Sequence, residues 1–416
     1  MMHGVLGVAG LLGVAFLCSE DRRRIPWRTV ISGVVLQVLL AVVLLDVPAS
    51  RRVMLWLSDG ANALQSATLT GTQFVFGYLG GGAPAFAELH PGASFILAFQ
   101  ALPLVLTISA LASLLFYWGI LQRITAGFAW LLRRWMGIGG PLAFGAAVHV
   151  FVGMIEAPLL VKPYLQRMQR GELFALMTCG MAGVAGTVMV IYASFLSPLV
   201  PNALGNILTA SVISTPASLA IAALMVPFDV RADQETRLVV EDPPAGTLDA
   251  LVKGTMDGIP ILAAIIAVLI VTIALVTLIN MVLGLLPAWN GVSNAPLTLQ
   301  AIFALPFRPV MWLIGVPWAE TSQAAALMAT KTVVNEFVAY VDFSHLPADG
   351  VSHRTRIILT YALCGFANFG SLGIVIGGLG SMAPGRRHEI IALGFRTILS
   401  GTLATCMSGA IAGAMI

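Results

Sequence analysis

The chain has 416 residues, of which 58% are hydrophobic and only 10% are charged. Soluble globular domains carry about 25% charged residues, and a chain with a mean hydropathy of +0.93 could not bury enough of its apolar surface in water. The composition therefore excludes a soluble protein and indicates an integral membrane protein, while a net charge of +3 is too small to favour nucleic acid as a partner.

Eight apolar stretches are long enough for transmembrane helices, since about 20 apolar residues cross the hydrocarbon core of a bilayer. They cover residues 3–18, 29–48, 94–120, 172–197, 205–228, 257–287, 354–380 and 390–415. The first stretch lacks preceding basic residues and a clear cleavage site, so we expect a retained helix rather than a signal peptide. The sequence thus predicts an all-α, multi-pass membrane protein.

Two further apolar stretches, 139–166 and 317–343, are interrupted by polar residues, glycine or proline. Such interruptions are not typical of simple transmembrane helices. We expect each stretch to form a re-entrant hairpin, which enters and leaves the membrane on the same side.

The segments between these elements differ in character. Residues 121–136 carry three arginines on an apolar, aromatic background, which predicts an interfacial helix lying along the membrane surface. The Gly-rich stretch 77–94 is typical of an external loop. Charged residues and the Pro243-Pro244 pair replace apolar sequence at 229–254, which indicates a linker between two halves of the chain.

Basic residues indicate the orientation of the chain, because they are enriched on the cytoplasmic side of a membrane. Eight crossings with two non-crossing hairpins bring four basic groups to one face, at residues 22–28, 123–170, the central linker and 386–387. Both termini then lie outside. Arg51, Arg52, Arg354 and Arg356 depart from this pattern.

The two halves resemble each other in plan. In the first half Glu156 stands at a hairpin tip and is followed by a Gly-rich span containing CGMAGVAGTVMV (179–190). In the second half Glu336 precedes a span containing CGFANFGSLGIVIGG (364–378). Paired interruptions in two halves are a sequence indication of a secondary transporter's binding site. We therefore expect an inverted repeat in which both carboxylates face one polar cavity near the midplane.

A structural role is the alternative for each polar residue in these stretches. A lone glutamate in an apolar helix can simply bond a neighbouring helix, but intramembrane carboxylates are costly and are usually functional. Asn368 and Ser371 could likewise serve helix packing. Their spacing of three, beside Gly365 and Gly370, favours the cavity.

At this point the sequence resembles the concentrative nucleoside transporter family over most of its length. The matching stretches occur in family order and spacing, and are RRIPWRTVISG, FILAFQALPLVLTISALASLLFYWGIL, FVGMIEAPLLVKPYL, KTVVNEFVAY and CGFANFGSLGI. The resemblance implies a homotrimer in the cell inner membrane, in which a scaffold domain holds the trimer and a transport domain carries nucleosides by alternating access. It implies symport with sodium or protons.

The same resemblance divides the chain into segments. Scaffold helices are expected in 1–120, and the interfacial helix, first hairpin and first broken helix in 121–228. A polar linker follows in 229–256, and a scaffold helix with an interfacial segment in 257–310. The second hairpin, the second broken helix and the C-terminal helix are expected in 311–416.

Residues expected to bind substrate are also implied by the resemblance. Glu336, Asn368 and Ser371 match the family positions that hold the ribose hydroxyls, and charge-assisted hydrogen bonds suit a carboxylate for this. Val188 and Phe366 match positions that pack on the base.

The first hairpin tip departs from the family. Where the family usually has Gly-Gln-Thr-Glu or Gly-Gln-Ser-Glu, this chain has Gly153-Met154-Ile155-Glu156. Met154 and Ile155 cannot read the hydrogen-bonding edge of uracil or cytosine. We therefore expect a ribose-binding site with an altered base preference, for example a purine, a modified base or pseudouridine.

The expected cation site departs as well. His149 and Gly183 stand where sodium-coupled members carry Asn and Ser side chains, and imidazole is a poor ligand for sodium. Histidine titrates near pH 6.5, so we expect proton coupling with His149 or Glu156 as the carrier. Residual sodium coupling through the backbone carbonyls of Val152 and Val184 is the alternative.

Other classes of protein remain as alternatives. An intramembrane enzyme is not favoured, because the chain has no HExxH, GxSxG or paired-aspartate motif. We expect no catalytic residues, no resident metal and no cofactor beyond the coupling ion. A nucleoside sensor or a channel of the same architecture is the second alternative, distinguished by the absence of saturable transport.

Overall fold

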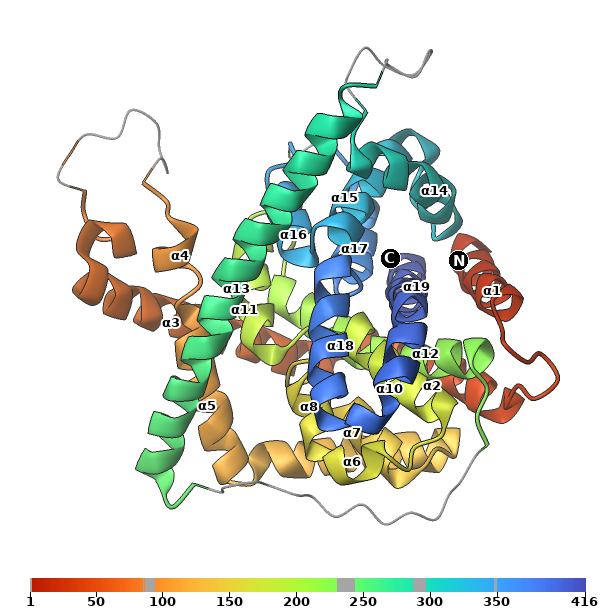
Figure 1. The fold of residues 1–416 in the computed structure, drawn as a ribbon. Coiled ribbons are helices and arrows are strands. Elements are labelled where there is room, and N and C mark those ends of the chain that lie inside the picture. Colours follow the sequence, from red (N-terminus) through yellow and green to blue (C-terminus); the bar gives the residue numbers. More distant parts are fainter. Residues whose placement is uncertain (1, 85, 87–93, 230–243, 287–296, 348–349) are drawn as a thin grey trace.

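The computed structural model describes the chain apart from residues 1, 85, 87–93, 230–243, 287–296 and 348–349. The secondary structure of these described residues is entirely helical (Figure 1). The predicted all-α membrane class is therefore confirmed.

The first half of the chain forms two N-terminal helices, an extended surface helix, a series of shorter helices and a final helix of 23 residues. These are α1 (Met2–Leu17), α2 (Trp27–Asp46), α3 (Pro48–Phe76), η1 (Gly77–Gly80), α4 (Leu97–Gln100), α5 (Leu104–Tyr117), α6 (Ile120–Met136), α7 (Gly140–Val148), α8 (Glu156–Leu160), α9 (Lys162–Leu165), α10 (Arg170–Ala182), α11 (Gly186–Leu196) and α12 (Ala203–Met225).

The second half repeats the sequence of hairpin and broken helix. Its elements are α13 (Thr247–Leu283), α14 (Leu299–Leu313), η2 (Trp318–Glu320), α15 (Thr321–Val333), α16 (Glu336–Ser344), α17 (His353–Leu363), α18 (Phe369–Met382), η3 (Pro384–Arg386) and α19 (Arg387–Ala414).

Helices of transmembrane length and composition occur at five of the eight predicted spans. In the described residues these are Trp27–Asp46, Leu97–Tyr117, Ala203–Met225, Thr247–Leu283 and Pro384–Ala414. The predicted first span is the shorter helix α1, with 16 residues. The remaining two spans are each divided into two helices.

The two divisions fall in the Gly-containing stretches that the sequence singles out. α10 ends at Ala182 and α11 begins at Gly186, while α17 ends at Leu363 and α18 begins at Phe369. Irregular backbone at this depth is tolerated only where protein or water satisfies it. The breaks are therefore the places to look for a polar site.

Two boundaries differ from the sequence-based expectation. α13 begins at Thr247, so it takes in the end of the 229–256 linker and starts ten residues before the predicted span at 257. Its first turns are polar, with Asp249 and Lys253 paired at 3.6 Å, and a hydropathy pattern does not extend a span through such residues. The long helix α3 was not predicted, because its 29 residues are too polar to count as a span.

The core of the molecule is formed by α10, α12, α17 and α19, with α2 packed against α12. Small polar residues join these helices. Gln37 Nε2 donates to Ser408 Oγ at 3.0 Å, and the hydroxyls of Ser408 and Ser214 lie 2.8 Å apart. The hydroxyls of Thr178 and Ser400 are also 2.8 Å apart. Such contacts allow close packing of helices in a membrane, where apolar burial drives little association.

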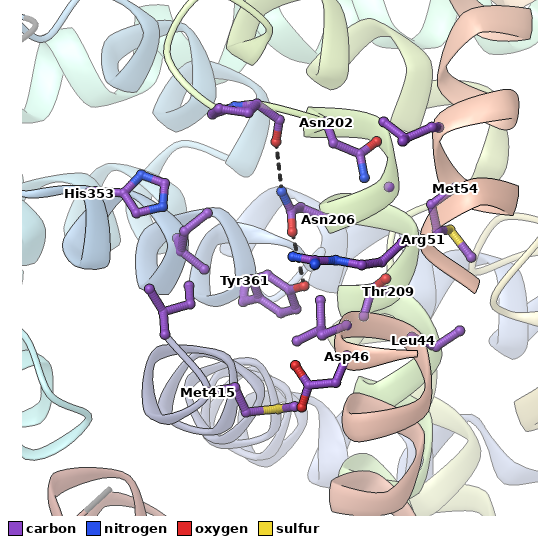
Figure 2. A pocket seen from close by; sticks show the side chains of 16 residues that line it. Leu44, Asp46, Arg51, Met54, Asn202, Asn206, Thr209, His353, Tyr361 and Met415 are labelled. Carbon is purple, nitrogen blue, oxygen red and sulfur yellow. Dashed lines mark hydrogen bonds between the residues drawn. The ribbon is translucent and has the colours of Figure 1, made fainter. Parts of the chain in front are cut away.

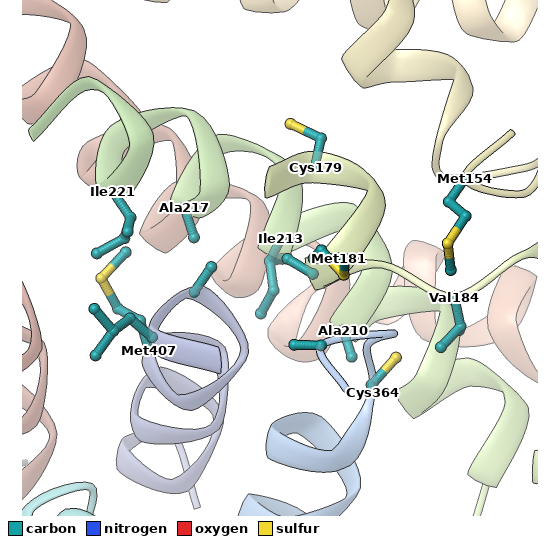
Figure 3. Close-up of a cluster of buried hydrophobic side chains, with 14 of the residues drawn as sticks. Met154, Cys179, Met181, Val184, Ala210, Ile213, Ala217, Ile221, Cys364 and Met407 are labelled. Carbon is teal, nitrogen blue, oxygen red and sulfur yellow. The ribbon is translucent and has the colours of Figure 1, made fainter. Parts of the chain in front are cut away.

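Apolar side chains fill the space between the same helices (Figure 3). Met181 of α10, Ile213 and Ile221 of α12 and Met407 of α19 are completely buried. The flexible methionines fill gaps between the branched side chains. These side chains therefore form a well-packed apolar core.

Two helical hairpins flank this core from opposite ends of the molecule. Figure 1 shows α7 and α8 at the end occupied by α6, and α15 and α16 towards the end occupied by α14. α7 packs on α6, and α15 packs on α14. The arrangement brings the two hairpin turns towards the middle of the molecule.

The helix α6 is amphipathic, as its sequence predicts. Thr125, Ala129, Leu132 and Met136 form its buried face, while its arginines are on the exposed part. Helix α6 packs against α7 and so supports the first hairpin.

The long helix α13 pairs chiefly with α5 and leaves most of its own surface exposed. Gly254 and Gly258 lie directly against α5, where a methyl group would collide with Ser113 and press on Leu106. The α5–α13 pair therefore stands beside the core (Figure 1), and its inner face forms one wall of a cavity.

Candidate functional site

Two asparagines begin the helices that follow the second hairpin turn and the second break. Asn335 is the N-cap of α16, and its Oδ1 accepts a hydrogen bond from the Val338 amide at 2.9 Å. Asn368 is the N-cap of α18, and its Oδ1 accepts from the Ser371 amide at 2.7 Å. These caps satisfy backbone donors that would otherwise be unpaired at a helix start.

Glu336 is the first residue of α16 and is only 5% exposed. The Tyr192 hydroxyl of α11 donates to its Oε1 at 2.7 Å, and Asn368 Nδ2 donates to its Oε2 at 2.8 Å. A buried carboxylate needs such donors, because burial without them is costly. The second hairpin, the first broken helix and the second broken helix therefore meet at this one side chain.

Glu156 is the first residue of α8, just after the first hairpin turn. Unlike Glu336, it is exposed, and its side chain has no hydrogen bond or ion pair within the described chain. The carboxylate folds back over Gly153, where any side chain would collide with it. The first acid is thus accessible and free, and the second is buried and held.

A cavity of about 230 Å³ lies between the hairpin turns, the broken helices and α13. All eight residues that the sequence assigned to substrate binding line it, namely Met154, Ile155, Glu156, Val188, Glu336, Phe366, Asn368 and Ser371. The two acidic side chains from opposite halves therefore share one cavity.

The cavity has a polar end and an apolar remainder. Glu336, Asn335, Asn368 and Ser371 gather at the second hairpin and break. Opposite them, α13 contributes a wall of aliphatic residues, which are Ile261, Ala264, Ile265, Val268 and Leu269. The first hairpin adds the apolar side chains of Met154 and Ile155.

Met154 and Ile155 are held in different ways. Met154 is buried, with its Cβ close to Gly180 of α10. Ile155 is 37% exposed and lies against Gly378 of α18. Each therefore joins the first hairpin to one of the broken helices as well as lining the cavity.

Main-chain hydrogen bonds link the first hairpin turn to the first break, and the first break to the second. The Gly186 amide donates to the Phe151 carbonyl at 3.1 Å, and the Phe366 amide donates to the Gly183 carbonyl at 3.2 Å. Val152 follows Phe151 in the turn, and Val184 follows Gly183 in the break. Backbone groups in the first hairpin turn and in the two breaks, which lie outside regular helix, thus form hydrogen bonds with one another.

His149 is the C-cap of α7 and is only 4% exposed. Its imidazole lies against α10, where a methyl group on Gly180 would come within 3.2 Å of Cε1. Its Nε2 is buried without a hydrogen-bond partner in the described part of the chain. Of the five residues assigned to cation coupling, His149, Val152, Gly183 and Val184 lie at this hairpin–break junction, and Glu156 lies in the cavity.

Sequence reasoning missed several residues of the site. Tyr192 donates a hydrogen bond to Glu336, and Asn335 caps the helix that Glu336 begins; both residues line the cavity. A buried tyrosine in an apolar helix requires a partner for its hydroxyl, which was an available signal. The aliphatic residues of α13 gave no signal, because they look like any lipid-facing residues.

Opposed hairpins and broken helices around a cavity with a buried, hydrogen-bonded carboxylate define the architecture of a secondary transporter. Family models described as Na⁺ dependent nucleoside transporter N-terminus, Nucleoside recognition, and Na⁺ dependent nucleoside transporter C-terminus match residues 6–79, 98–199 and 206–413. The chain belongs to the concentrative nucleoside transporter family, whose members are cation-coupled.

Relatives match over the whole length. An uncharacterized transporter from Haemophilus influenzae is 37% identical over 425 residues, covering 100% of this chain and 98% of the relative. The putative nucleoside permease NupX from Escherichia coli is 34% identical over 423 residues, covering 100% and 99%. The structure of CNTnw in an inward-facing substrate-bound state is similar with a TM-score of 0.88 and 36% identity, covering 99% and 98%.

These relatives are transporters and permeases rather than enzymes. The prediction of a multi-pass membrane protein that is not an enzyme is therefore confirmed.

Proposed function

We propose that this chain takes up nucleosides across the cell inner membrane by alternating access, in symport with a cation. The proposal depends on one observation, the Glu336 carboxylate held by Tyr192 and Asn368 at the polar end of a cavity of about 230 Å³. A cavity with fixed acceptors at one end and an apolar remainder suits a molecule with a sugar at one end and a flat ring at the other.

We assign the ribose to Glu336, Asn368 and Ser371. A carboxylate offers about four acceptor positions, and Tyr192 and Asn368 use two of them. The remaining positions can accept hydrogen bonds from the vicinal hydroxyls of a ribose, and such charge-assisted bonds are the strong ones.

We assign the base to the apolar part of the cavity, against Met154, Ile155, Val188 and Phe366. Side chains of this kind recognise a base by shape and stacking and cannot discriminate its hydrogen-bonding edge. We therefore expect a preference that differs from uridine and cytidine, towards a purine, a modified base or pseudouridine.

We propose that the coupling ion is a proton, carried by His149 or Glu156. His149 Nε2 is unpartnered at the junction of the first hairpin and first break, and Glu156 is free in the cavity. Either group can take up a proton without first losing a protein partner. Sodium held by the backbone carbonyls of Val152 and Val184 is the alternative, but His149 and Gly183 supply no side-chain oxygen to such a site.

Movement would divide the chain into two bodies. We propose that the two hairpins, re-entrant in the membrane, move with the broken helices as a transport domain in 121–228 and 311–416. Scaffold helices in 1–120 and 257–310 would hold a homotrimer. The exposed apolar surface of α13 supports a role in contacts with lipid or other subunits.

Uptake of labelled nucleosides into proteoliposomes tests the function. We expect saturable uptake and counterflow with the wild-type protein, and loss of both with Glu336→Gln, which removes the charge that binds the ribose. Asp342→Asn is the matched control, because Asp342 is an exposed acid on the same helix outside the cavity. Binding without uptake would indicate a sensor, and current without saturation a channel.

Imposed gradients test the coupling ion in the same vesicles. An inward pH gradient should drive accumulation in the absence of sodium, and His149→Asn should weaken this response. Accumulation driven by a sodium gradient alone would overturn the proton assignment while leaving nucleoside uptake intact.

A further inference from the structure

A second cavity, of about 600 Å³, lies away from the substrate cavity and shares no lining residue with it. Five helices have an end at this place. α2 ends at Asp46, α3 begins at Pro48, α12 begins at Ala203, α17 begins at His353 and α19 ends at Ala414. Three of these helices, α2, α12 and α19, have the length and composition of membrane spans. Because spans end where the hydrocarbon core gives way to water, we place the pocket near a membrane surface. We refer to this cavity as the helix-end pocket (Figure 2).

Two opposite charges line the helix-end pocket. Asp46 is the last residue of α2, and Arg51 stands in the first turn of α3 (Figure 2). Both are exposed, and neither side chain has a hydrogen bond or ion pair within the part of the chain that the structure describes. They are therefore available to a ligand that carries a cation and an anion.

The rest of the pocket divides into a polar floor and an apolar wall. On the floor Tyr361 Oη donates to Asn206 Oδ1 at 3.2 Å, and Asn206 Nδ2 donates to the Pro201 carbonyl at 3.1 Å. These groups already have protein partners. The wall consists of side chains from α2, α3, α17 and the end of the chain, namely Leu44, Leu45, Met54, Leu55, Ile357 and Met415.

We propose that the helix-end pocket binds a zwitterionic aminophospholipid of the phosphatidylethanolamine type. The lipid phosphate pairs with the Arg51 guanidinium, whose planar donors match phosphate oxygens. The primary ammonium pairs with Asp46, and the glycerol and first acyl carbons lie along the apolar wall. A ligand of this kind is already resident at the depth where the helices end.

The charges select among lipids. An anionic lipid such as phosphatidylglycerol can satisfy Arg51 but brings no cation for Asp46, whose charge then opposes the phosphate. Phosphatidylcholine carries a cation without N–H donors, so it cannot hydrogen-bond Asp46. The pocket also accounts for Arg51, one of the arginines that depart from the basic-residue pattern of the cytoplasmic face.

Lipid retention measures this selection. Wild-type protein is reconstituted in vesicles of equal phosphatidylethanolamine and phosphatidylglycerol, extracted in mild detergent, and examined by native mass spectrometry. We expect selective retention of phosphatidylethanolamine. Arg51→Ala and Asp46→Asn should each lower retention about tenfold, the effect of one lost charge-assisted contact.

The matched control is Arg52→Ala, which removes a neighbouring charge that does not line the pocket. Its lipid retention should equal that of the wild type, and thermal unfolding in the same detergent verifies that all variants are folded. Equal retention of the two lipids by the wild type, or unchanged retention in both pocket variants, overturns the proposal. Displacement of the lipid by millimolar phosphoethanolamine in water would instead assign the pocket to a soluble zwitterion and overturn the lipid assignment.

Discussion

At the scale of single residues, the candidate site depends on how one buried carboxylate is held. Glu336 has two donors from other elements, Tyr192 and Asn368, and these orient its remaining acceptor positions towards the cavity. The sequence identified Glu336 and Asn368 because polar residues stand out in an apolar background. The sequence indicates that the Tyr192 hydroxyl needs a partner, but it does not identify Glu336 as that partner, because only the folded chain brings α11 beside α16.

Replacing Tyr192 by Phe should weaken substrate affinity while leaving the fold intact. Glu336 would lose one donor, and hydrogen bonds to charged groups contribute about 1.5–3 kcal/mol. The carboxylate could then rotate away from the proposed ribose position. We expect the KM for uptake in proteoliposomes to rise by about tenfold or more. Tyr117→Phe, at the exposed end of α5, is the control, and an unchanged KM in Tyr192→Phe would contradict a role for this contact.

A second group whose environment matters is Glu20, in the connection between α1 and α2. Arg170 donates to it from Nη2 at 3.0 Å and from Nε at 3.2 Å, and Arg396 also donates to it. The hydrogen bonds from Arg170, together with the charges of both arginines, hold the pKa of Glu20 below its ordinary value, against a smaller opposing effect of burial.

Because the folded state lowers this pKa, the stabilisation is present above the ordinary pKa of 4.5 and is lost as pH falls through the folded value. Glu20→Gln should therefore lower the melting temperature in detergent at pH 7, by a free energy below about 1 kcal/mol for a partly exposed pair. The difference from wild type should shrink at pH 4 and below. Asp21→Asn, whose partner Arg24 is largely exposed, should show no comparable effect, and a constant difference across pH would exclude this origin.

At the scale of helices, the two broken helices pack closely against each other at their breaks. Gly365, in the second break, lies where a methyl group would press on Thr405 and come within 2.9 Å of the Met181 carbonyl. Met181 belongs to α10, so this contact joins the two broken helices. A larger residue would separate them and disturb the hydrogen bond from Phe366 to Gly183.

Gly365→Ala should lower both stability and uptake. Overpacking at a buried contact costs about 1–3 kcal/mol, which thermal unfolding in detergent would detect. Gly373→Ala is the matched control, because a methyl group there meets no atom within 4 Å. In the helix α18 that change should be neutral or slightly stabilising. Equal behaviour of the two variants would show that the close approach at Gly365 is not required.

The sequence predicts most of the helices, but it misses helix α3 and the true start of helix α13. The spans, the interfacial helix α6 and the positions of both breaks follow from apolar length, basic residues and glycine. α3 could not be recognised, because a polar helix of 29 residues has neither the composition of a span nor a repeated motif. The early start of α13 at Thr247 was missed for a similar reason, since its first turns are stabilised by local ion pairing rather than by membrane burial.

At the scale of the whole molecule, the substrate cavity lies at the boundary between the core and the α5–α13 pair. The hairpin tips and broken helices supply the polar end, while α13 supplies an aliphatic wall. Polar contacts such as that between the hydroxyls of Thr178 and Ser400 join the core helices to one another, whereas the contacts of α13 across the cavity are apolar. Apolar contacts without directed hydrogen bonds can slide, so this boundary suits relative movement of the two parts.

A bulky residue in the aliphatic wall should therefore block transport without unfolding the protein. Ala264→Phe directs an aromatic ring into the cavity of about 230 Å³, where it competes with the nucleoside for space. We expect uptake in proteoliposomes to fall by about tenfold or more, with an unchanged melting temperature in detergent because the ring fills open space. Ala263→Phe adds the same ring to the same turn of α13 but outside the cavity, and it should transport normally. If both variants transport like the wild type, the wall of α13 does not contact the substrate, and only the hairpins and broken helices would bind it.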